Sequence, residues 1–69
     1  MEYSEIGARI AKLRIEKHYT REAFAEMVPM SPKFLYEVET GKKGISVMTL
    51  YHISEALAVS CDYLVKGKE

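Results

Sequence analysis

The chain has 69 residues, of which 48% are hydrophobic and 29% are charged, and its ten Lys and Arg residues balance ten Asp and Glu residues. A chain of this length forms one domain without room for a deep catalytic cleft, and no apolar run reaches the roughly 20 residues that span a bilayer. We therefore expect one domain over residues 1–69 and no membrane-spanning helix, and the zero formal charge removes the simplest argument for nucleic-acid binding, a strongly basic domain.

The first predicted helix runs from about residue 4 to residue 17. Ser4 is its predicted N-cap, because the hydroxyl can accept a free backbone N–H of the first turn. Residues that recur at helical spacing predict one apolar face. They are Ile6, Ala8, Ile10, Ala11, Leu13 and Ile15.

A second helix is predicted between the N-cap candidate Thr20 and Met27. Pro29 enforces its end, because the proline ring disfavours the helical conformation at Val28 and the missing N–H cannot continue the hydrogen-bond ladder. The residues predicted to face inward are Ala23, Phe24 and Met27.

A third helix is predicted to follow the N-cap Ser31, with Pro32 in its first turn, and to end at about Thr40. Gly41 stands where a left-handed residue commonly ends a helix. The apolar residues of this helix are Phe34, Leu35 and Val38.

Two further helices are predicted after the basic, turn-prone loop at residues 41–44. Ser46 caps the fourth helix, and Ser60 caps the fifth, which covers Cys61–Lys66 and ends at Gly67. The apolar residues of the fourth helix are Met48, Leu50, Tyr51, Ile53, Ala56 and Leu57. The whole succession predicts an all-α fold, a compact bundle of five short helices.

The second and third predicted helices meet at a tight corner, which is the layout of a helix-turn-helix. The small Ala25 on the second helix allows a close, steep crossing against Leu35 and Val38 on the third. One exposed face of the third helix is then free to enter a DNA groove.

Five separated motifs occur along the chain: Ile6-Gly-Ala-Arg9-Ile-Ala-Lys-Leu13-Arg14, Thr20-Arg-Glu-Ala-Phe24-Ala25, residues 31–39, Gly41-Lys42, and Leu57-Ala-Val-Ser60-Cys-Asp-Tyr-Leu64. In order and spacing they resemble the Cro/phage-repressor-like (Xre-type) helix-turn-helix family, over residues 6 to about 67. The resemblance implies a lambda-repressor-like DNA-binding domain, usually dimeric on operator DNA, whose second helix grips phosphate and whose third helix reads the major groove. It also implies a structural salt bridge between Arg14 and Glu39.

Carried over by position, the resemblance implies a DNA-backbone contact at Arg21 and base contacts at Pro32, Lys33 and Glu37. Lys33 can donate to guanine or to phosphate, and the alternative is a solvated lysine. Tyr36 can stack or hydrogen-bond at the DNA surface, or it simply covers the edge of the domain. Two lysines of the loop flank the same edge and can neutralise phosphates. The predicted DNA-binding set is Arg21, Ser31, Pro32, Lys33, Tyr36, Glu37, Lys42 and Lys43.

Three positions depart from the family pattern. The family often has Gln where this chain has Arg21, Gly where it has Pro29, and a polar residue where it has Pro32. Because proline cannot adopt a positive φ, the corner must be built differently or shifted by a residue. Pro32 can offer a base only apolar contact, for example with a thymine methyl, and Glu37 can accept from cytosine N4 or repel phosphate.

Catalytic and metal chemistry have no candidate residues in the sequence. Cys61 has no second cysteine for a disulfide, and His18 and His52 lack the spaced partners that a zinc site or a nucleophile requires. We therefore expect no enzyme, cofactor, metal or small-molecule substrate. The N-terminal residues lack the basic start and apolar stretch of a secretory signal, so the expected location is cytoplasmic.

The leading hypothesis is a sequence-specific transcriptional regulator, expected to be a repressor. It would bind double-stranded DNA as a homodimer, on two half-sites about 34 Å apart. Tyr63, Leu64 and Val65, with Tyr51, supply more apolar surface than a small core needs, and any excess is the candidate dimer contact. The alternative is a protein-interaction module such as an antitoxin-like domain, which the zero net charge, the departures at Pro29 and Pro32, and Glu37 favour.

Overall fold

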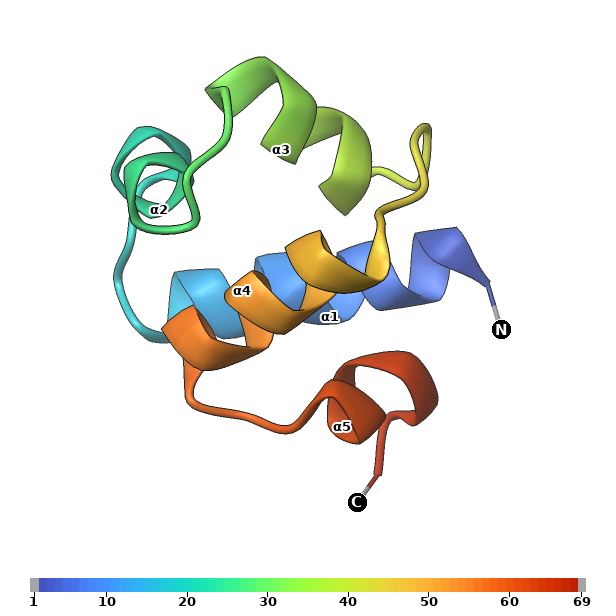
Figure 1. Ribbon diagram of the computed structural model, residues 1–69. Coiled ribbons are helices and arrows are strands. Elements are labelled where there is room, and N and C mark those ends of the chain that lie inside the picture. The colour runs from blue at the N-terminus through green and yellow to red at the C-terminus, as the bar shows by residue number, and fades with distance from the viewer. Residues whose placement is uncertain (1, 69) are drawn as a thin grey trace.

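Five helices form the structure, a computed structural model that describes residues 2–68. They are α1 (Tyr3–Glu16), α2 (Arg21–Met27), α3 (Pro32–Glu39), α4 (Val47–Leu57) and α5 (Cys61–Lys66). Within this range no strand interrupts the helices (Figure 1). The prediction of an all-α fold with five short helices is confirmed.

Hydroxyl side chains start four of the five helices. Thr20, Ser31, Ser46 and Ser60 each accept the backbone N–H of the residue three positions on, at 3.0 to 3.1 Å. Each such bond satisfies one of the N–H groups that the first turn of a helix leaves free, so these four N-cap predictions are confirmed.

The N-cap predicted for α1 is wrong. This helix begins before Ser4, and its N-cap is Glu2, whose side chain makes no capping hydrogen bond. The carbonyl oxygen of Glu2 instead accepts the N–H groups of Glu5 and Ile6, both at 3.1 Å. Ser4 therefore lies inside the first turn, where its hydroxyl is not needed as a cap.

Left-handed residues follow the ends of four helices. Gly41 and Gly67 have φ angles of 80° and 79°, as predicted for glycines that end helices. His18 and Ala58, which follow α1 and α4, take φ angles of 64° and 58° although each carries a Cβ. That conformation costs a non-glycine residue about 1–2 kcal/mol, so both positions are strained. This strain was not predicted from the sequence.

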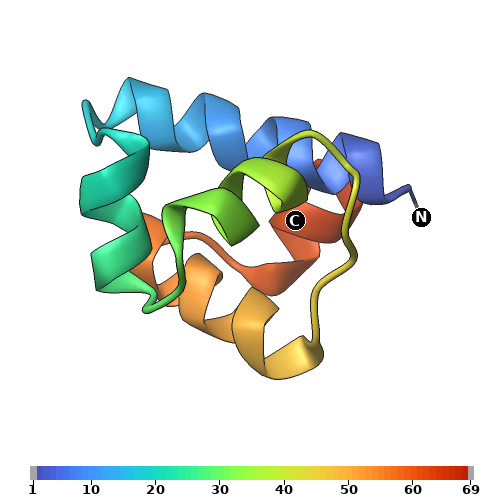
Figure 2. The same cartoon turned by 90° about the horizontal axis from the view of Figure 1, so that it is seen from above.

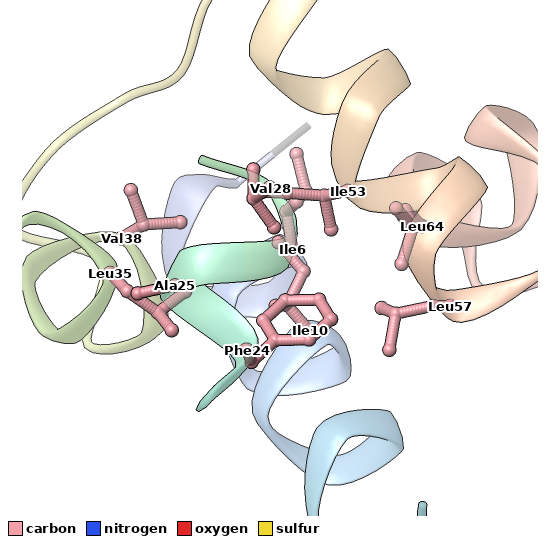
Figure 3. Packing of buried hydrophobic residues seen from close by; sticks show 10 residues of the cluster. All are labelled: Ile6, Ile10, Phe24, Ala25, Val28, Leu35, Val38, Ile53, Leu57 and Leu64. Carbon is pink, nitrogen blue, oxygen red and sulfur yellow. The ribbon is translucent and has the colours of Figure 1, made fainter. Parts of the chain in front are cut away.

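All five helices send side chains into one core (Figure 3). The side chains that are fully buried include Ile10 of α1, Phe24 of α2 and Leu35 of α3. From the other side, Ile53 and Leu57 of α4 and Leu64 of α5 complete the cluster. Full burial of a large apolar side chain is worth about 1.5–3 kcal/mol, so this cluster is the main source of stability.

Six of the apolar residues named from the sequence are exposed: Ala8, Ile15, Ala23, Met27, Met48 and Tyr51. The prediction that Ala23 and Met27 face inward is therefore wrong. Ile15 lies in the last turn of α1 and is 61% exposed, and Met48 lies in the first turn of α4 and is 62% exposed. Helical spacing shows which side of a helix is apolar, but short neighbouring helices cover only part of that side. The end turns therefore extend past the core.

The helix α1 contacts α3, α4 and α5, and α2 packs against α3. In Figure 1, α3 lies on one side of α1 and α5 lies on the other. Gly7 allows the close approach of α1 to α3, because a Cβ at this position would meet the carbonyl oxygens of Val38 and Glu39, the latter at 2.7 Å. This packing seats α3 directly on α1 with its opposite face turned outward (Figure 2).

Candidate nucleic-acid interface

The corner between α2 and α3 is built without a left-handed residue. Val28, the C-cap of α2, keeps a helical conformation with φ −81° and ψ −28°, and no residue of the corner is among the positive-φ residues of the described chain. The N–H of Met30 donates to the carbonyl oxygen of Ala25 at 2.8 Å, which closes a turn wider than a helical one. The chain thereby reaches Ser31 around Pro29 and needs no glycine there.

The packing inside this corner follows the predicted contact between a small and two large residues. Ala25 is 1% exposed, and Leu35 and Val38 are buried with it in the core. The absence of a longer side chain on α2 lets α3 lie close across it. The two helices therefore have the helix-turn-helix arrangement, in which α2 packs against the inner side of α3.

The outward face of α3, together with its N-cap, carries four of the eight residues predicted to contact DNA. Ser31, Pro32, Lys33 and Tyr36 are exposed, whereas Glu37 is half-buried. Among the described residues no other segment passes over this face in Figure 2, where α3 lies toward the viewer. The structure thus brings four of the predicted side chains to one open surface.

The two lysines of the loop stand at the end of the same helix. The backbone N–H groups of Lys42 and Lys43 both donate to the carbonyl oxygen of Glu37, at 2.9 and 3.2 Å. Gly41, in the left-handed conformation, makes this reversal of the chain possible. Both lysines are exposed, and these backbone hydrogen bonds hold the segment that carries them beside the end of α3.

A buried carboxylate ties α1 and α2 to the end of α3. Glu39 Oε2 accepts from Arg14 Nε at 2.6 Å, and Glu39 Oε1 accepts from Arg14 Nη2 at 3.1 Å. Arg14 Nη1 donates in turn to the carbonyl oxygen of Tyr19 at 2.9 Å. The structure therefore places the predicted pair in a bidentate, buried ion pair, whose partners come from the two helices that Gly7 brings together.

Arg21, the first residue of α2, shares the same carboxylate. Its Nε and Nη2 both lie 3.1 Å from Glu39 Oε1, and its side chain is 36% exposed. Its guanidinium carbon also lies 5.2 Å from the ring centroid of Tyr36, and Lys42 Nζ lies 5.5 Å from the same centroid. Two cations from different segments thus lie over one aromatic ring on α3.

Two structural roles were not predicted from the sequence. Arg9 Nη1 donates to the carbonyl oxygens of Leu64 and Val65, at 2.8 and 3.1 Å, and so binds α5 to α1. Gly7 lies inside α1, where glycine destabilises a helix relative to alanine. A glycine at such a position indicates a close backbone contact, and this signal was available in the sequence.

The rest of the described surface offers little chemistry. An open hollow of about 540 Å³ lies where the ends of α1 and α4 meet the start of α5, and Leu13, Ser54, Ala58 and Tyr63 are among its lining residues. Between residues 2 and 68 there is no group of three or more His, Cys, Asp or Glu side chains that could hold a metal ion. The longest helix in the same range has 14 residues, and none is both long and apolar enough to cross a bilayer.

The fold and this surface define a helix-turn-helix DNA-binding domain of the lambda-repressor-like type. A family model described as a helix-turn-helix domain matches residues 7–69, and the chain belongs to that family. The relatives that the chain matches are named as regulators of transcription.

Named relatives agree with this assignment. The chain is 36% identical over 55 residues to the uncharacterized HTH-type transcriptional regulator y4dJ of Sinorhizobium fredii. This match covers 80% of the chain and 71% of y4dJ. It is 29% identical over 63 residues to the HTH-type transcriptional regulator RamB of Mycobacterium tuberculosis, which covers 91% of this chain. That match spans only 13% of RamB.

A solved structure shows the same fold. The P22 c2 repressor, crystallised in complex with a synthetic operator, superposes with a TM-score of 0.87 at 30% sequence identity. The match covers 91% of this chain and 96% of the repressor chain.

Proposed function

We propose that the protein is a sequence-specific transcriptional repressor that binds operator DNA as a homodimer, with α3 in the major groove. The observation that carries the proposal is the open outer face of α3, beside which Lys33, Lys42 and Lys43 are exposed. The carboxylate at the end of the helix, Glu39, is buried against two arginines and so does not oppose phosphate. An α-helix with its side chains is about 10–12 Å in diameter, which suits a major groove about 12 Å wide.

The proposed contacts divide into two kinds. Lys42 and Lys43 neutralise phosphates and supply affinity without sequence preference. At the start of α3, Ser31 and Pro32 approach the base edges, where Pro32 offers only apolar contact, and Lys33 donates to guanine or to a phosphate. Glu37, where it reaches the groove, accepts from cytosine N4. The operator complex of the P22 c2 repressor supports this use of the shared fold.

The dimer contact is proposed on α4. Of the residues named from the sequence for this role, Leu64 is fully buried and Tyr63 and Val65 are half-buried, which leaves Tyr51. Tyr51 is 48% exposed, and Val47 and Met48 beside it on the first turns of α4 are 81% and 62% exposed. Contiguous exposed apolar side chains of this kind commonly mark protein contacts.

A direct test first selects bound sequences from a random DNA pool and then measures affinity by fluorescence anisotropy between 50 and 200 mM salt. If Lys42 and Lys43 of both protomers contact phosphates, log K should fall with log[salt] with a slope of about −3.6 or steeper, because each of the four contacts contributes about −0.9. Lys43→Ala should then reduce the slope by about 2 in the dimer. Lys66→Ala is the matched control, because Lys66 is exposed and belongs to α5, which lies on the opposite side of α1 from α3 (Figure 1).

Affinity that is indifferent both to salt and to Lys33→Ala would contradict the proposal. The dimer is tested separately by sedimentation, where Met48→Glu should shift the protein to a monomer and weaken binding to two half-sites while a single half-site is still bound.

The second candidate function is a protein-interaction module, and the observation that favours it is the same exposed surface of α4. In that case Met48→Glu should abolish capture of the partner, and substitutions on α3 such as Lys33→Ala should have no effect. Selection that enriches no DNA sequence would favour this candidate over the repressor.

A further inference from the structure

Arg21 lies where a phosphate contact is expected, but its guanidinium is paired with Glu39 and its side chain is only 36% exposed. Nε and Nη2 both face Glu39 Oε1 at 3.1 Å, and the guanidinium carbon lies 5.2 Å from the Tyr36 ring centroid. Arg14 already forms a bidentate pair with Glu39, so the carboxylate does not need a second cation for charge balance. Arg21 instead places its planar guanidinium between the buried carboxylate of Glu39 and the ring of Tyr36.

Tyr36 is the residue that this arrangement holds. Lys42 Nζ lies 5.5 Å from the ring centroid, so the ring is contacted by cations from α2 and from the loop after α3. Cation–π contacts of this kind restrict the directions in which a side chain can point. The ring nevertheless remains 43% exposed on the outer face of α3, and is therefore ordered and accessible at once.

The chemistry of the face around Tyr36 indicates what it can read. Pro32 lies one helical turn away on the same side and has no donor, so the two residues form an apolar stripe between cations. Among the groups that base pairs present in the major groove, the apolar one is the C5-methyl of thymine. A rigid aromatic ring beside a proline is suited to that methyl group rather than to a hydrogen-bonded base edge.

We infer that Tyr36 is a specificity-determining residue that recognises a thymine methyl group through its ring, and that Arg21 is its positioning residue rather than a phosphate contact. This inference rests on the proposed function, because it assumes that α3 occupies the major groove. It assigns the departure at Arg21 a role: arginine can form the fork to Glu39 and lie flat over the ring, and a lysine can do neither.

The test uses the selected operator with each thymine replaced in turn by deoxyuridine, which removes only the methyl group. Loss of one buried methyl contact should weaken wild-type binding about fourfold per half-site, or about 15-fold when both half-sites of a homodimer are changed. Tyr36→Phe keeps the ring and should keep this discrimination. Tyr36→Ala should bind the thymine and deoxyuridine operators equally well at that position.

Arg21→Lys separates positioning from phosphate binding. A lysine keeps the charge, so a phosphate contact predicts unchanged discrimination and an unchanged salt slope. The positioning role predicts an unchanged salt slope together with a loss of thymine discrimination, and no further loss when Arg21→Lys is added to Tyr36→Ala. Thermal melting of each variant checks that the fold is intact, which the partial exposure of both side chains favours.

Three outcomes are informative. If Tyr36→Ala or Arg21→Lys discriminates thymine from deoxyuridine as the wild type does, the inference is overturned while the repressor proposal stands. If the wild type enriches no sequence at all, the proposed function itself fails. If discrimination is lost as described, both stand.

Discussion

Replacing Glu39 by alanine should remove a large part of the stability of the domain. The substitution leaves Arg14 with one hydrogen bond, from Nη1 to the carbonyl oxygen of Tyr19, and leaves Nε and Nη2 without a partner in a side chain only 8% exposed. Breaking one side of a buried ion pair costs about 3–5 kcal/mol. A domain of this length has about 3–10 kcal/mol of stability in total, so Glu39→Ala should lose about half of it or more.

Urea denaturation followed by circular dichroism measures this loss, and two controls locate its cause. Arg21→Ala removes a cation that is 36% exposed and should cost no more than about 1 kcal/mol. The double replacement Arg14→Leu with Glu39→Leu leaves no unpaired buried charge and should be less destabilising than Glu39→Ala. A loss below about 1 kcal/mol for Glu39→Ala, or a double variant that is just as unstable, would refute the reasoning.

Two backbone positions give further stability predictions. Gly7→Ala should destabilise the fold by about 1–3 kcal/mol, because the added Cβ would collide with the carbonyl oxygens of Val38 and Glu39. The same urea denaturation measures this loss. An unchanged midpoint would show that α1 and α3 are not closely packed at this position. Ala58→Gly should stabilise the fold by about 0.5–1 kcal/mol and raise Tm by a few degrees, because relief of the left-handed alanine outweighs the added chain entropy. Ala8→Gly, exposed within α1, should lose about 1 kcal/mol, and the same sign for both glycine substitutions would contradict the explanation.

The boundaries of the helices could be read from the sequence because they depend on neighbouring residues. A hydroxyl at Ser31 reaches an N–H only three positions along the chain, and Gly41 adopts its φ for reasons within one turn. Ser4 is the exception, because α1 begins at Tyr3 after the N-cap Glu2, which makes no side-chain capping bond, and so gives no hydroxyl signal in the sequence. The helix-turn-helix itself could be predicted because its small and large residues lie within a single short segment.

The extent of burial could not be read in the same way. Ile15 and Met48 satisfy the helical period, yet they lie on turns that short neighbouring helices do not reach. The period of a sequence describes one helix, whereas burial depends on the position of the others. The exposed apolar surface of α4, on which the dimer proposal depends, is therefore a property of the assembled domain.

The amino-acid sequence by itself determined the five helices, the N-caps of four of them, the helix-turn-helix and the family, because each is encoded in residues a few positions apart. Only the tertiary structure decided that Arg21 turns inward to Glu39 and lies over Tyr36, since these residues are 18 and 15 positions apart in the chain. It also decided that Gly7 lets α1 approach α3 closely, because the backbones of these two helices meet only after the chain has folded. The orientation of α3 thus depends on contacts between distant segments, whereas its formation as a helix depends on local ones.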